Sequence, residues 1–116
     1  MIKYRGEVDT ETMGEALEEI EETGPLYAKA KARRMQLEAY IKTKKATLFA
    51  QAHMCKTIAE KENWCIAHPD YKEIIDAHVD AVQEEEALRW LLKLSEMQVE
   101  VWRTIQATKR TEARVL

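Results

Sequence analysis

Residues that interrupt helices are confined to a few points of this chain. All three glycines (Gly6, Gly14 and Gly24) lie near the N-terminus, and the only prolines are Pro25 and Pro69. Glycine and proline disfavour a helix interior more than any other residues. The remaining sequence is rich in Ala, Leu, Glu, Lys, Gln, Met and Arg, which favour helices, and it has no alternating Val/Ile/Thr run of strand length. The sequence therefore predicts an all-α fold.

The same breaks divide the 116-residue chain into helical segments of one domain. Gly24 and Pro25 are expected to end a first helix and to start a second. The predicted parts are, in order, an acidic segment (1–24) with a short helix at 12–22, a long basic helix (25–61), a loop (62–68) and a second long helix (70–110). Two long helices joined by a short connection favour an antiparallel hairpin.

Neither end of the sequence indicates a membrane or secreted protein. The first residues are polar, and no apolar run approaches the roughly 18–20 residues that a membrane span requires. The two cysteines, Cys55 and Cys65, fit a reducing compartment better than a disulfide scaffold. We therefore expect a cytoplasmic protein with no membrane contact.

Charge alternates strongly along the chain, although the net charge is only −3. Counting Lys, Arg, Asp and Glu gives −6 for residues 1–24, +7 for 25–61, −7 for 62–100 and +3 for 101–116. Adjacent blocks of opposite sign suit antiparallel packing or a staggered assembly, and the two basic blocks could bind an anionic polymer.

The C-terminal helix carries more apolar surface than one partner helix can cover. Two neighbouring seams run along it, and their residues are Leu88, Leu92, Val99 and Trp102 in one, and Leu91, Leu94, Val101 and Ile105 in the other. A helix that is apolar over so wide an arc needs several neighbours. The sequence therefore predicts a homo-oligomer larger than a dimer, assembled through coiled-coil-like C-terminal helices.

A basic stripe on the second predicted helix is the candidate nucleic-acid site. Its residues are Lys31, Arg34, Lys42, Lys45 and Lys56, with Phe49 on the same face and Lys44 almost opposite. Cations spaced along a helix can neutralise successive phosphates, and an aromatic ring can stack on a base. This pattern favours single-stranded over duplex nucleic acid because no duplex-recognition motif is present. The alternative is a solvated face whose positive charge complements the acidic segments of neighbouring subunits.

Metal binding and catalysis find little support in the sequence. His53, Cys55, Cys65 and His68 are ligand types, but His53 and Cys55 would point about 200° apart on one helix. Asp76, Asp80 and Glu84 form an acidic ladder at intervals of four residues, and we interpret it as a solvated face or as a partner for the basic helix. No nucleophile–base pair or phosphate-binding glycine loop appears. We therefore expect a non-enzymatic protein without metal or cofactor.

Three segments together resemble the UvsY recombination mediators of T-even phages. They are Ile41-Lys42-Thr43-Lys44-Lys45-Ala46-Thr47-Leu48-Phe49-Ala50-Gln51, Arg89-Trp90-Leu91-Leu92-Lys93-Leu94 and Trp102-Arg103-Thr104-Ile105, within about residues 41–110. The resemblance implies a ring-like homo-oligomer that binds single-stranded DNA, contends with a single-strand-binding protein and helps to load a RecA-type recombinase, in the host cytoplasm if the chain is phage-encoded.

The sequence departs from the family pattern at the family's basic pair. Lys44, Lys45, Leu48 and Ala50 match the pattern, but Phe49 and Gln51 stand where the two DNA-binding basic residues belong. The resemblance therefore places any DNA contact on the flanking basic residues of the stripe. The competing functional interpretation is a helical oligomeric adaptor, such as a phage inhibitor of a host factor, that acts through protein contacts alone.

Overall fold

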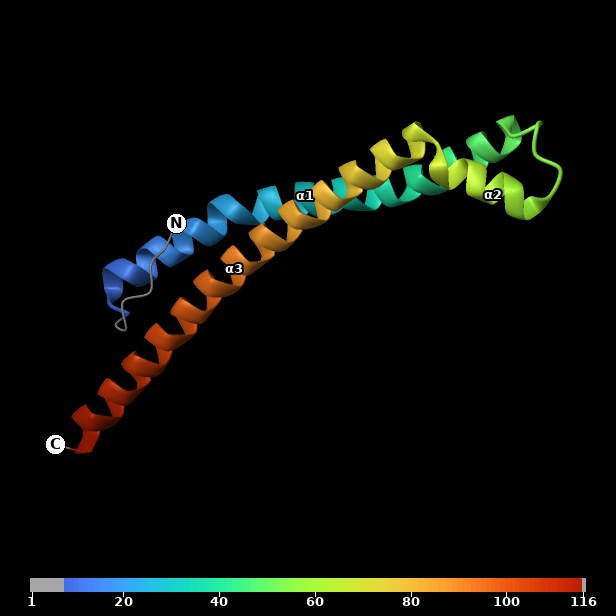
Figure 1. Cartoon of the computed structure of the whole chain (residues 1–116). Coiled ribbons are helices and arrows are strands. Elements are labelled where there is room, and N and C mark those ends of the chain that lie inside the picture. Colours follow the sequence, from blue (N-terminus) through green and yellow to red (C-terminus); the bar gives the residue numbers. More distant parts are fainter. Residues whose placement is uncertain (1–7, 116) are drawn as a thin grey trace. The chain divides into compact units, whose positions relative to one another are not determined.

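A computed structural model of the chain describes residues 8–115 and confirms the all-α prediction. Its elements are α1 (Thr10–Gln51), α2 (Ile58–Ala67) and α3 (Pro69–Val115), and the described residues form no strand (Figure 1). Ion pairs join Arg34 to Glu85 and Glu38 to His78, so that residue numbers rise along α1 as they fall along α3. The long helices α1 and α3 therefore pack as an antiparallel hairpin.

The hairpin divides into two compact units, each with its own buried side chains. The terminal unit contains α1 up to Ala28 and α3 from Glu86, and the central unit contains Lys29–Glu85. In the terminal unit the buried residues are Val8, Ala16, Thr23, Ser95 and Gln98. In the central unit they are Ala30, Leu48, Ala52, Cys65, Ala81 and Glu85. Small residues dominate both sets, as close packing of two helices requires.

The predicted break at Gly24 and Pro25 is wrong, because α1 continues through both residues. Proline removes one helical hydrogen bond and strains the preceding turn, but it does not by itself force a helix to end. Thr23 and Gly24 before Pro25 are weak helix formers as well, but the side chain of Thr23 is buried in the terminal unit. Packing against α3 therefore outweighs the local cost of the proline.

The predicted end of the basic helix at Lys61 is also wrong. Helix α1 ends at Gln51, and α2 occupies Ile58–Ala67, most of which was expected to be a loop. The Thr57 hydroxyl, at the N-cap of α2, accepts a hydrogen bond from the Glu60 amide at 3.1 Å. The Glu60 carboxylate in turn accepts one from the Lys56 amide at 2.9 Å. Thr57 thus caps the new helix and Glu60 holds the residue before the cap, so that α2 starts where sequence periodicity suggested the end of an old helix.

The start of α3 lies where the sequence places it. His68 is extended, with φ −69° and ψ 134°, as the residue before a proline prefers. Pro69 then occupies the first helical position, where its missing N–H costs nothing. The Asp70 amide donates to Nδ1 of His68 at 3.1 Å. Helix α3 runs on to Val115, a few residues beyond the predicted end near 110.

Arg34 joins the two long helices of the central unit. Its Nε and Nη2 atoms donate to the two carboxylate oxygens of Glu85 at 2.5 and 3.1 Å, a bidentate arrangement. Its Nη1 atom donates to Glu38 at 3.0 Å, and Glu38 also lies 3.3 Å from Nε2 of His78. Glu85 is buried, so this pairing compensates for the removal of its charge from water.

Acid should destabilise the fold through this cluster. The hydrogen bonds from Arg34 lower the pKa of Glu85 and the pKa of Glu38 below the usual value of 4.5. A carboxyl with a lowered folded-state pKa contributes stability that is complete above 4.5 and is lost as pH falls through the folded-state pKa. We expect the urea midpoint of the wild type to fall below about pH 4.5, and Arg34→Gln to lower the midpoint at neutral pH and to flatten this acid dependence.

Arg103→Gln provides the control, since it removes an ion pair with Glu100 that is largely exposed to solvent. Exposed ion pairs contribute little to stability, so this variant should follow the wild type at every pH. An Arg34→Gln protein with the wild-type pH profile would contradict the role assigned to Arg34.

Candidate nucleic-acid interface and association surface

Three lysines near the end of α1 form a cluster of positive charge in the central unit. Lys42 is exposed, and Lys44 and Lys45 are half-buried. Arg33 and Arg34, one end of the same basic segment, are paired with Glu84 and Glu85. By contrast, none of the three lysines forms an ion pair with another residue in the range 8–115. Their charge is therefore available to an anionic ligand.

The structure separates the remaining residues of the predicted stripe. Lys31 is exposed on α1, and its charge helps to lower the pKa of Glu85. Arg34 is engaged by two carboxylates, so it has no free guanidinium to offer a phosphate. Lys56 lies in the connection after α1 and thus is not on the predicted helical face, because the helix ends at Gln51.

Phe49 is half-buried, and its ring is already in contact with a cation. Nζ of Lys61, from α2, lies 5.4 Å from the ring centroid. This cation–π contact holds a further lysine beside the lysines of α1. A stacked nucleic-acid base would have to displace Lys61 or use what remains of the ring's accessible surface.

The candidate metal ligands are not brought together. Within the described range no group of three or more His, Cys, Asp or Glu side chains is arranged to hold a metal ion. Cys65 is fully buried in α2, where its thiol donates a weak hydrogen bond to the Lys45 carbonyl at 3.8 Å. In the acidic ladder, Glu84 pairs with Arg33 at 3.6 Å, which fits the interpretation of the ladder as a partner for the basic helix.

The predicted oligomerisation residues all lie on α3 in the terminal unit, and none is fully buried. Val101 is exposed, and the other members are half-buried: Leu88, Leu91, Leu92, Leu94, Val99, Trp102 and Ile105. The side chains that are fully buried on this part of α3 are instead the polar residues Ser95 and Gln98. The apolar arc of α3 is therefore only partly covered by the other described residues.

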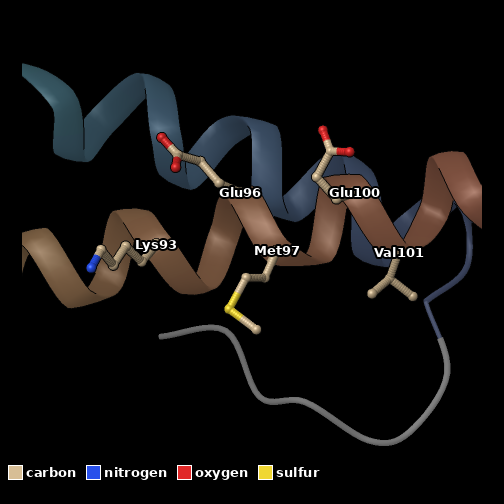
Figure 2. Close-up of a pocket in the computed structure, with 5 residues that line it drawn as sticks. All are labelled: Lys93, Glu96, Met97, Glu100 and Val101. Atoms are coloured by element: carbon tan, nitrogen blue, oxygen red, sulfur yellow. The ribbon is translucent and has the colours of Figure 1, made fainter.

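Two large exposed apolar residues on α3 were missed by the sequence reasoning. Trp90 is 61% exposed and Met97 is 63% exposed, and they are seven residues apart on the face that also holds Leu94 and Val101. Their heptad spacing is the signal that could have identified them. Met97 and Val101 point to the same side of α3, whereas Glu96 and Glu100 point to the other (Figure 2). These four residues and Lys93 line a groove of about 470 Å³.

A buried amide borders this apolar region. Gln98 is only 2% exposed, and neither atom of its side-chain amide has a hydrogen-bond partner among the described residues. The indole Nε1 of Trp102, one turn further along, also lacks a partner there. Polar groups at core positions of helical assemblies lower stability but restrict the registers that the helices can adopt.

None of the helices in the described part of the chain is long and apolar enough to cross a membrane. Comparisons with protein-family models, with curated proteins and with solved structures find no match to this chain.

Proposed function

We propose that this protein is a non-enzymatic single-stranded DNA-binding protein of the recombination-mediator type. The observation that carries the proposal is the cluster of Lys42, Lys44 and Lys45, whose charges have no ion-pair partner among the described residues. The cluster places three cations within four residues of one helix. A polyanion supplies the missing counter-charge.

The cluster suits a flexible strand better than a duplex. Lys42 and Lys44 lie on nearly opposite sides of α1, and Lys45 lies between them around the helix. A single strand can wrap around one end of a helix to reach cations on both flanks, whereas a rigid duplex presents its phosphates on a fixed surface. Lys31 and Lys56 extend the positive field on either side of the cluster.

The mediator role itself rests on the resemblance to the UvsY proteins and on the apolar surface of α3. Homo-oligomers would multiply the lysine cluster, so that one strand contacts several subunits and gains avidity. Such an assembly could hold a strand while a RecA-type recombinase replaces a single-strand-binding protein. The competing function is a helical adaptor that uses the α3 surface for protein contacts and binds no DNA.

Salt dependence of binding tests the proposal. We expect wild-type protein to bind oligo-dT of about thirty nucleotides, with log affinity falling linearly against log salt by about 0.7 for each phosphate contacted. Binding to a duplex of the same length should be weaker at every salt concentration. Absence of binding to oligo-dT at low salt would favour the adaptor.

A further inference from the structure

We propose that the exposed apolar face of α3 in the terminal unit binds the same face of a second copy of this chain, with the two helices antiparallel and in one defined register. The face consists of Trp90, Leu94, Met97 and Val101, and it is bordered by Lys93 and Glu100. This contact goes beyond DNA binding, and the experiment below requires no DNA.

The spacing of the face is that of a coiled-coil seam. Trp90, Leu94, Met97 and Val101 follow one another at intervals of four, three and four residues. Three of them are exposed, at 61% for Trp90, 63% for Met97 and 39% for Val101. Side chains of this size at seam positions of an otherwise charged helix indicate a partner helix with a similar seam.

The charges that border the seam decide the polarity of the partner. Lys93 and Glu100 are seven residues apart, so both lie on the same flank of the seam. In an antiparallel pair this flank faces the same flank of the second copy. Lys93 of each copy then lies opposite Glu100 of the other copy, which gives two ion pairs. In a parallel pair it faces the opposite flank, where Leu91, Gln98 and Ile105 lie, and neither Lys93 nor Glu100 meets an opposite charge there. Antiparallel pairing is therefore favoured.

The same charges select one register. When Leu94 packs opposite Met97 of the second copy, and Trp90 opposite Val101, Lys93 faces Glu100 in both directions. If the second helix is shifted by one heptad in one direction, the Glu100 residues of the two copies lie opposite each other. If it is shifted by one heptad in the other direction, the two Lys93 residues lie opposite each other. Like charges opposed at an interface oppose association. Only the register with Leu94 opposite Met97 also places Lys93 opposite Glu100.

Among residues 8–115, only weak contacts compete for Lys93 and Glu100. Lys93 lies over the Trp90 ring, with Nζ at 4.9 Å from the ring centroid, and Glu100 pairs with Arg103 at a highly exposed position. Both contacts are local to α3 and weak in water. Association can therefore redirect both charges at little cost.

A charge-swap series, measured by sedimentation equilibrium without DNA, tests the contact. Lys93→Glu and Glu100→Lys should each weaken self-association by about tenfold or more, because each replaces two attractive pairs with two repulsive ones. The double variant, with both substitutions, restores opposite charges and should associate within about threefold of the wild type. Glu73→Lys is the matched control. It makes the same charge change as Glu100→Lys on the same helix, but Glu73 is an exposed residue of the central unit outside the seam, so the variant should associate like the wild type.

Met97→Glu supplies a second test of the seam itself. Because Met97 is largely exposed in the single chain, the variant should keep its helical circular dichroism. Its association should weaken by about a hundredfold, since the substitution places an unpaired carboxylate at the centre of the contact. Single charge variants that associate like the wild type, or a double variant weaker than both singles, would overturn the proposed register. A wild type that stays monomeric at high concentration would overturn the contact. It would not bear on DNA binding by the lysine cluster, which the oligo-dT titration tests separately.

Discussion

Reversing the charges of Lys42 and Lys45 together should weaken single-stranded DNA binding by on the order of a hundredfold at low salt. Both side chains lie on α1 of the central unit, and neither forms an ion pair with another described residue. Lys42→Glu with Lys45→Glu therefore replaces an exposed and a half-buried cation with two anions that repel phosphate. In a salt titration, the slope of log affinity against log salt should flatten by about 1.4, which corresponds to two lost phosphate contacts.

A matched variant separates local contacts from net charge. Lys29→Glu with Lys109→Glu changes the net charge by the same amount, at exposed positions outside the lysine cluster. This variant should lose far less affinity, because its charges act on the strand only at long range through screening solvent. Equal losses in the two double variants would mean that DNA responds to overall charge and that Lys42 and Lys45 have no particular role.

Replacing Leu48 with alanine should lower the free energy of unfolding by about 2–5 kcal/mol. Leu48 is 2% exposed and is the largest apolar side chain that is so fully buried in the central unit. The substitution removes buried methyl groups and leaves a cavity that the surrounding small residues, such as Ala52, cannot fill. Urea denaturation followed by circular dichroism measures the change.

Leu26→Ala makes the same chemical change on the same helix at an exposed site. Because Leu26 is 55% exposed, its replacement should alter the free energy of unfolding by no more than about 0.5 kcal/mol. If the two substitutions cost the same, Leu48 does not occupy the core described here.

The fold class was predictable because helix propensity and the scarcity of glycine and proline both favoured helices. The position of Pro69 also located the start of α3. The predictions of two helix boundaries were wrong, for different physical reasons. At Pro25 the tertiary packing of the terminal unit overrides a local helix breaker, and sequence alone does not report that packing. At Gln51 the error was avoidable, since Thr57 and Glu60 have the spacing of a capping box and mark a new helix start.

The candidate site was only partly predictable. A helical projection identified the lysines correctly as residues of α1, but it could not show that Arg34 is held by Glu85, which lies far away in sequence. It also placed Lys56 on a helix that ends before that residue. On α3 the width of the apolar arc was evident in the sequence. Which of its residues remain exposed depends on where α1 lies, and for that reason Trp90 and Met97 were missed.

Mass spectrometry under native conditions, with and without oligo-dT, tests the central claim most directly. It reports in one spectrum the number of chains in each assembly and whether a DNA strand is bound to it. We expect an assembly of two or more chains at low salt that gains the mass of one oligonucleotide, and we expect this gain to disappear as ammonium acetate is raised. An assembly whose mass is unchanged by oligo-dT at the lowest salt concentration would contradict the proposal that this protein binds single-stranded DNA.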